Sequence, residues 1–253
     1  MTLQAWQWAV AALGAMGIGL SKTGIPGLGI LAVALFAIAM PTRESVGVVL
    51  PVLIVGDIVA VTAYRRHAVW SHLFKLFPWA AAGVVIGWLA MGRLSDTAVA
   101  HLIGILLIVL VAVQFARQWA ESRSKKEAEP SRHPLLAPVM GVLGGFATMV
   151  ANAAGPIMVL YLLAAGLPKM EFIGTGAWYF FVLNLFKVPF SVKLGLINMR
   201  SLPVDAVLAP ACIAGALGGR WVVKHIDQKV FNSIALALTF VAAIKLLWPE
   251  GSH

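Results

Sequence analysis

The sequence predicts an all-α polytopic membrane protein that consists of two homologous helical repeats. Its 253 residues are 60% hydrophobic and only 11% charged, with a mean hydropathy of +0.90, whereas soluble domains carry about 25% charged residues. Apolar runs recur along the chain, many near the roughly 20 residues that a helix needs to cross a bilayer. The pattern of runs and interruptions then starts again in the second half. Because the runs are continuous and not alternating, a transmembrane β-barrel is excluded.

The net charge of +9 does not indicate a nucleic-acid partner, because no basic patch interleaved with aromatic residues occurs. Lysine and arginine gather in short loops, where they set the orientation of the spans. We therefore expect an integral protein of a bacterial inner membrane, surrounded by lipid; the sequence leaves a homodimer open. The six histidines show no metal-ligand spacing, so neither a metal site nor a cofactor is predicted.

A glycine-rich stretch, residues 14–29, interrupts the first apolar segment. It holds six glycines and Pro26 between apolar runs at about 4–20 and 27–40. Each run is marginal as a full span, so we expect a hairpin of two half-helices with an unwound break between them. At membrane depth, unwound backbone is tolerated only where protein or a wet cavity surrounds it. Transporters build substrate sites from such broken helices.

Three full spans are predicted to follow, at about residues 45–64, 73–92 and 97–117. The next stretch is polar and mixed in charge, which is typical of a linker. Each half is expected to hold one broken helix or hairpin and three spans. The predicted divisions are a first transmembrane repeat (1–117), a cytoplasmic linker (118–134) and a second transmembrane repeat (135–250).

The two halves match at several positions in register, which is the basis for predicting a repeat. The second half has its own interruption around Asn152, and paired interruptions at matching positions indicate a binding site. The glycines in the third pair below are better explained by close helix packing. The matched pairs are residues 41–47 with 168–174, Asp57 with Asn184, 83–87 with 215–219, Lys22 with Asn152, and Pro26 with Pro156.

The basic loops predict the orientation of the chain. Loops 65–75 and 117–132 carry most of the positive charge in the first half and are two spans apart, so both should be cytoplasmic. If each break is a hairpin, each half crosses the membrane an odd number of times and the halves are inverted about a pseudo-twofold axis. If each broken segment crosses as one bent helix, the repeats are parallel. We favour inversion.

The two breaks predict an anion site. Small oxyanions are held by helix N-terminal amides, hydroxyls and cations, and the segments after Pro26 and Pro156 begin helices whose first amides have no partner within the helix. For Lys22, the alternative is a loop lysine that reaches the surface; for the glycines, it is helix packing. The candidate substrate-binding residues are Ser21, Lys22, Thr23, Gly24, Gly27, Asn152, Gly155, Tyr179 and Asn184.

Two further ionisable residues, Asp57 and Lys187, stand inside apolar runs. A charge at the bilayer centre costs at least about 2.5–3.5 kcal/mol, so each needs a partner or water. Asp57 could pair with Lys22 or Lys187, or carry a proton; a purely structural ion pair is equally open. Lys187 could instead snorkel to the interface, since Pro189 is expected to mark a helix end. Tyr179 could equally belong to an ordinary apolar face.

Several motifs resemble the TauE/SafE sulfite exporter family, which belongs to the toluene-sulfonate-uptake permease superfamily. The most specific is Gly-Leu-Ser-Lys-Thr-Gly-Ile-Pro-Gly-Leu-Gly at residues 19–29; the others are Pro41, the run from Leu50 to Asp57, Tyr64-Arg-Arg-His67 and the Gly83-x-x-x-Gly87 helix. The resemblance covers nearly the whole chain, including its duplication. It implies a prokaryotic or plant-type membrane protein that moves sulfite, sulfonates or related sulfur anions.

We therefore predict a secondary transporter, and not an enzyme, that exports a small sulfur-containing or organic anion such as sulfite or a sulfonate. The anion would be held at the broken-helix N-termini near the membrane midplane. An intramembrane enzyme would need clustered carboxylates or a nucleophile with a base inside the spans, and Asp57 alone does not supply these. A structural membrane subunit would not explain the paired breaks. The P-loop pattern Gly-x-x-x-x-Gly-Lys is absent, so ATP-driven pumping by this chain is not expected.

Overall fold

The computed structural model describes residues 3–40, 42–91, 105, 108, 112, 133–199 and 201–247. The elements in these residues are helices, which agrees with the predicted all-α class. The predicted span 97–117 and the linker 118–134 lie almost wholly outside the described residues. The helices are α1 (Ala5–Thr23), α2 (Leu28–Ala39), α3 (Thr42–Tyr64), η1 (Arg65–His67), α4 (Trp70–Ala90), α6 (Leu136–Ala151), α7 (Ala154–Ala164), α8 (Lys169–Lys193), α9 (Leu202–His225) and α10 (Gln228–Leu247).

Three stretches of the described chain are long and apolar enough to cross a membrane: Ser45–His67, Trp70–Ala90 and Leu202–His225. The first two coincide with predicted spans. Large apolar side chains lie on the surface, among them Phe74 at 69% and Trp221 at 65% exposure. Such side chains are stable at the surface when lipid tails, and not water, surround the protein.

The first interruption is a hairpin, as predicted. Gly14 lies against Phe36 near the end of α2, and Gly29 lies against Ser21 near the end of α1, so the two helices run antiparallel. The break itself is shorter than predicted, because α1 continues to Thr23 and only residues 24–27 are non-helical. Gly27 adopts a left-handed φ of 89° that favours glycine at the turn.

The second interruption is shorter still. Helix α6 ends at Ala151, Asn152 takes a left-handed φ of 52°, and α7 begins at Ala154. The helix was predicted to begin after Pro156, but Pro156 lies inside its first turn. This is possible because a proline there forfeits no intrahelical hydrogen bond.

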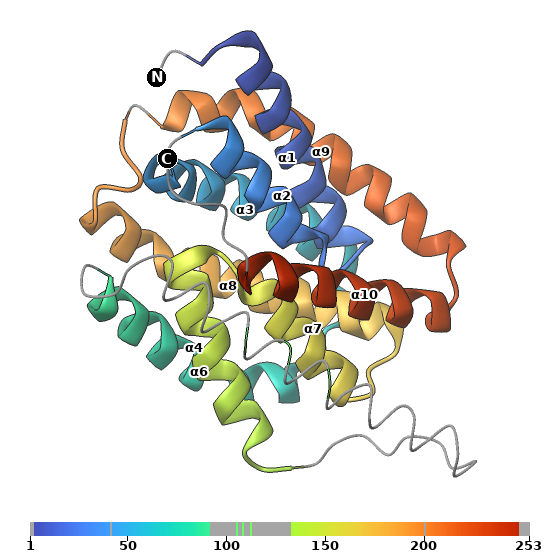
Figure 1. Ribbon diagram of the computed structural model, residues 1–253. Helices are drawn as coiled ribbons and strands as arrows, with labels where there is room; N and C mark the ends of the chain where they lie inside the picture. Colours follow the sequence, from blue (N-terminus) through green and yellow to red (C-terminus); the bar gives the residue numbers. More distant parts are fainter. Residues whose placement is uncertain are drawn as a thin grey trace.

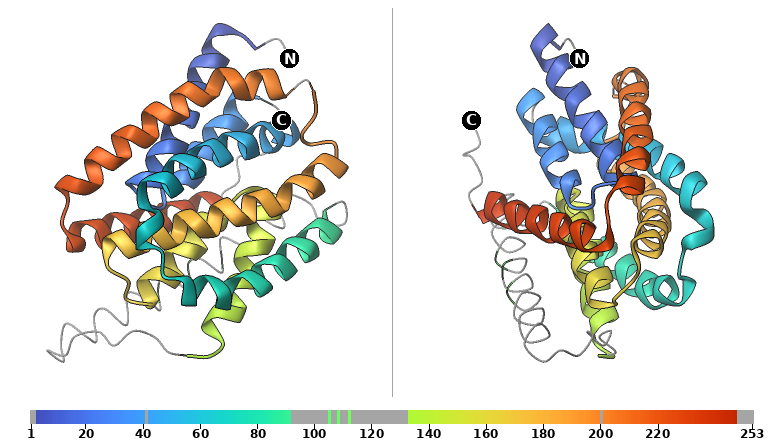
Figure 2. Two further views of the ribbon diagram at one scale, coloured as in Figure 1. Left: turned by 180° about the vertical axis from the view of Figure 1, so that it is seen from behind. Right: turned by 90° about the vertical axis from the view of Figure 1, so that its right-hand side faces the viewer.

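Helices from the two parts of the sequence pack against each other in pairs. Helix α1 lies beside α9, α4 beside α6, and α3 and α8 lie between these pairs (Figures 1 and 2). Helix α10 lies against α2 and α7. The predicted packing role of the glycines is confirmed: a Cβ at Gly83 would collide with the backbone of α6, and one at Gly215 would collide with the backbone of α1.

Helices α3 and α8 run antiparallel at the centre. Gly47, near the start of α3, lies against the backbone of Leu196, just after the end of α8. Reciprocally, Gly174, near the start of α8, lies against the backbone of His67 at the end of η1.

Candidate functional site

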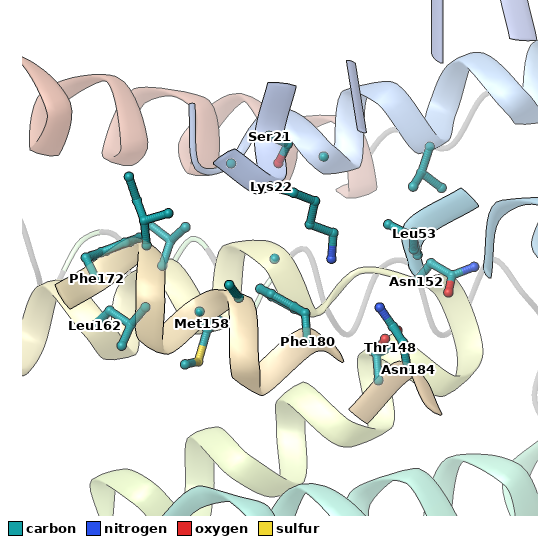
Figure 3. Close-up of a pocket in the computed structure, with 18 residues that line it drawn as sticks. Ser21, Lys22, Leu53, Thr148, Asn152, Met158, Leu162, Phe172, Phe180 and Asn184 are labelled. Carbon is teal, nitrogen blue, oxygen red and sulfur yellow. The ribbon is translucent and has the colours of Figure 1, made fainter. Parts of the chain in front are cut away.

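A cavity of about 80 Å³ lies between the two breaks (Figure 3). Since about 10–15 Å³ measured in the same way holds one water molecule, the cavity has room for a small ligand or several waters. Apolar side chains from α2, α3, α7 and α8 form much of its wall. The polar side chains that line it come from both parts of the sequence: Ser21, Lys22, Thr148, Asn152 and Asn184.

Lys22 reaches the cavity from the last turn of α1 (Figure 3). Its ammonium Nζ lies 2.7 Å from Oδ1 of Asp57 and 4.2 Å from the centre of the Phe180 ring. Only 9% of its side chain is exposed, so the alternative of a lysine that reaches the surface is wrong. Both contacts compensate for the loss of water around a buried ammonium group.

Asp57 joins the two central helices. Its Oδ2 accepts a hydrogen bond of 2.6 Å from Nδ2 of Asn184, while its other oxygen faces Lys22. The side chain is fully buried on α3, and Asn184 is buried on α8. Of the roles left open by the sequence, the structure therefore places Asp57 in an ion pair with Lys22 and not with Lys187.

Lys187 is 2% exposed and does not snorkel to an interface. Helix α8 continues through Pro189 to Lys193, so the expected helix end at the proline is wrong. The Lys187 ammonium donates to the carbonyl and hydroxyl oxygens of Thr148, at 2.8 and 3.2 Å, and to Oδ1 of Asn152 at 2.6 Å. Its hydrogen-bond acceptors among the described residues are thus all uncharged.

Lys187 also orients the amide of Asn152. Because an ammonium group can only donate, the oxygen of the amide must face it and the nitrogen must point elsewhere. That nitrogen, Nδ2, is buried and has no hydrogen-bond partner among the described residues. Asn152 lines the cavity, and its amide is a donor without a partner among the described residues.

The first turns of both half-helices border the cavity. Gly27 and Gly29 bring the start of α2 to its wall, and Gly155 brings the start of α7. A Cβ at Gly155 would have no atom within 4 Å, so the cavity is open at this point. Both helix starts carry partial positive charge.

Three predicted residues lie away from the cavity. Thr23 faces α9 and donates to the carbonyl of Ala216 at 2.6 Å, because α1 continues as a helix through this position. Gly24 packs against the backbone of Gly219. Tyr179 is 1% exposed and stacks on Phe77, with ring centres 6.2 Å apart. Contacts within the protein account for all three.

The sequence-based prediction did not include two residues that line the cavity, Phe180 and Thr148. Phe180 lies four residues before Asn184 and seven before Lys187, a spacing that places all three on one helical face. Thr148 lies four residues before Asn152, one turn earlier on α6. The sequence thus contained a helical-spacing signal for both, once a polar residue of the same helix had been chosen as a site residue.

Comparison with known proteins supports the resemblance. A family model described as "Sulfite exporter TauE/SafE" matches residues 10–246, which include both breaks. Comparison with curated proteins and with solved structures gave no match. Because the family match extends over nearly the whole chain, the protein belongs to the TauE/SafE sulfite exporter family, a family of membrane transporters.

Proposed function

We propose that this protein is a secondary transporter that exports a small sulfur-containing or organic anion, such as sulfite or a sulfonate, across a bacterial inner membrane. The family match supports a membrane transporter of the sulfite-exporter type. The observation that carries the choice of an anion is the charge around the cavity. The buried Lys187 and the largely buried Lys22 lie near it, with the carboxylate of Asp57.

This arrangement has a formal excess of one positive charge. Lys22 and Asp57 compensate each other, whereas Lys187 is held by uncharged oxygens among the described residues. An uncompensated buried charge is unfavourable. A monovalent anion in the cavity would balance it, while a cation would add to the excess.

The hydrogen-bonding groups around the cavity favour the same ligand class. Lys22, Asn152 and Ser21 line the cavity, and the ammonium, amide and hydroxyl groups of these side chains can all donate. The starts of α2 and α7 add backbone amides and the positive ends of two helix dipoles. Donors to a charged oxygen form bonds about twice as strong as those to a neutral one, which selects oxyanions over neutral analogues.

Asp57 gives the transporter a means of coupling to protons. Its carboxylate already contacts the ammonium of Lys22, so an anion bound at Lys22 must share that cation with it. Protonation of Asp57 would release Lys22 for the anion. The inside-negative membrane potential can also drive export, because each negative charge that leaves gains about 2.3 kcal/mol per 100 mV.

Two inverted repeats, residues 1–117 and 135–250, would explain why both breaks meet at one cavity. The antiparallel contacts of α3 with α8, and the matching pairs of α1 with α9 and α6 with α4, support this architecture. A pseudo-twofold axis between α3 and α8 would place Lys22 and Asn152 on opposite sides of the same cavity. Both would then lie near the midplane of the membrane.

The test is a binding panel on the purified protein, read by calorimetry. Methanesulfonate and sulfite are compared with dimethyl sulfone, which is a neutral analogue of nearly the same shape as methanesulfonate. We expect heat of binding from the anions only, and recovery of each anion unchanged by mass spectrometry. Equal binding of dimethyl sulfone would reject the anion site, and chemical conversion of the anion would favour the enzyme alternative.

A further inference from the structure

Three oxygen atoms surround the ammonium group of Lys187 at the end of α6. They are the carbonyl oxygen of Thr148 at 2.8 Å, its hydroxyl oxygen at 3.2 Å and Oδ1 of Asn152 at 2.6 Å. Two of them come from the last turn of the half-helix and the third from its cap residue. Lys187 itself comes from a different helix, α8, and is almost fully buried.

Oxygens in this arrangement are cation ligands. The last carbonyls of a helix carry partial negative charge, and transporters with broken helices use half-helix C-terminal ends and unwound carbonyls to coordinate a coupling cation. Carboxylates are the preferred ligands of calcium and magnesium. The three ligands here are all neutral, which suits a monovalent cation and not a divalent one.

We propose that the ammonium group of Lys187 is a tethered cation that fills a monovalent-cation site at the break between α6 and α7. The protein then needs no dissolved alkali cation at this site, and removal of the lysine side chain leaves a site that takes up free Na⁺ or methylammonium. The inference goes beyond anion export and does not depend on it, since the cation site is defined by Thr148 and Asn152 alone.

The tethered cation also acts on the anion cavity through Asn152. The cation that faces Oδ1 keeps the oxygen of the amide turned toward Lys187 and its nitrogen turned away, in a residue that lines the cavity. Lys187 is thus a positioning residue for the cavity, and a free cation in its place would restore the same amide orientation.

The test compares thermal stability of purified variants in different cations at constant chloride concentration. Lys187→Ala opens the site, whereas Lys187→Met removes the charge but keeps a side chain that fills the space. Lys193→Ala, on the same helix, is the matched control because Lys193 is exposed and contacts only the Trp88 ring among the interactions described. Each variant and the parent are melted in Na⁺, in methylammonium and in N-methylglucamine, which is too large for the site.

We expect Lys187→Ala to melt below the parent in N-methylglucamine and to regain roughly 5 °C or more in saturating Na⁺ or methylammonium. For the parent, for Lys187→Met and for Lys193→Ala, the melting temperature of each protein should be the same in all three cations. In Lys187→Ala, the further change Thr148→Val should raise the cation concentration needed for the effect, because it removes one ligand.

Three results would overturn the proposal. The first is a Lys187→Ala variant that is indifferent to the cation. The second is an equal gain in Lys187→Met or Lys193→Ala, which would be a general effect of the salt. The third is a Lys187→Ala variant that fails to fold even when it is produced and purified in Na⁺ or methylammonium, since either cation should fill the site. None of these measurements uses an anionic substrate, so failure of the anion proposal would not affect them.

Discussion

At the scale of single residues, the two lysines near the cavity have different surroundings, from which we infer different roles. Lys22 lines the cavity and contacts the carboxylate of Asp57, whereas Lys187 contacts the uncharged oxygens of Thr148 and Asn152. We infer that Lys22 touches the anion directly. By the same inference, Lys187 contributes charge at a distance and orients Asn152.

Lys22→Gln should therefore weaken anion binding more than Asn152→Ala does. Both side chains would donate to a charged oxygen, but Lys22 also adds the Coulombic attraction of a cation. A hydrogen bond to a charged group contributes about 1.5–3 kcal/mol, so we expect Lys22→Gln to raise Kd about tenfold or more. Lys22→Arg should be intermediate, because a planar guanidinium group does not fit a site shaped for a point charge. Calorimetry with methanesulfonate measures the Kd of each of the three variants.

The double variant Lys22→Gln with Asp57→Asn is the control for net charge. It has the same formal charge around the cavity as the parent protein, but it has no ammonium group at residue 22. Binding that stays weak in the double variant supports direct contact with Lys22. If Lys22→Gln alone binds as tightly as the parent, the assignment of the anion site to this cavity is wrong.

Asp57→Asn should tighten anion binding and remove the pH response of transport. The amide cannot compete for Lys22 as the carboxylate does, and it cannot take up a proton. Flux into liposomes is measured with and without an imposed pH gradient, for the parent and the variant. A pH response that persists in the variant removes Asp57 from proton coupling.

The sequence alone could not predict which side chains of the site lie close together or which way they face. The charge pattern identified Asp57 and Lys187 as residues that needed partners, but a linear sequence gives no distances, so the choice between Lys22 and Lys187 stayed open. Thr23 was assigned to the site because of its neighbours in the chain. On a helix, however, adjacent residues point in different directions, and Thr23 faces α9 while Lys22 faces the cavity.

At the scale of helices, the glycines serve two purposes that look alike in the sequence. Gly27 forms the turn between α1 and α2, whereas Gly19 lies inside α1 and allows the backbone of α9 to approach. The glycine-rich stretch therefore predicted that a break exists but not where it begins. Only the neighbouring helix distinguishes a glycine that bends the chain from one that packs.

Two alanine substitutions near the second break distinguish a glycine that packs from one that borders the cavity. A Cβ at Gly145 would collide with the backbone of Ala80 on α4, so Gly145→Ala should destabilise the protein by about 1–3 kcal/mol. Gly155→Ala meets open space, so it should leave the melting temperature unchanged or higher while the new methyl group weakens anion binding. Thermal melting measures the stability of both variants and calorimetry measures their anion binding. Equal loss of stability in the two variants would contradict the different packing of Gly145 and Gly155.

At the scale of the whole molecule, the antiparallel packing of α3 and α8 determines where the connecting loops lie. The loop after α3 and the loop after α8 are at opposite ends of this pair, because the start of each helix contacts the end of the other. Inverted repeats require corresponding loops to face opposite sides of the membrane. Parallel repeats would place them on the same side.

Thiol labelling from one side of the membrane tests the inversion. His67 and Met199 are exposed in these two loops, and the native Cys212 is buried. In a Cys212→Ala background, His67→Cys and Met199→Cys should react with an impermeant maleimide from opposite sides of oriented vesicles. Reaction of both from one side would contradict the inverted architecture.

The most direct test of the central claim is anion efflux from liposomes that contain the purified protein and are loaded with sulfite or methanesulfonate. A potassium diffusion potential, negative inside, should accelerate efflux in the parent protein, and Lys22→Gln should reduce that efflux about tenfold or more at subsaturating anion. Dimethyl sulfone should show no protein-dependent efflux. Anion efflux that is the same with parent protein, with Lys22→Gln and with empty liposomes would contradict the proposal that this cavity carries an anion across the membrane.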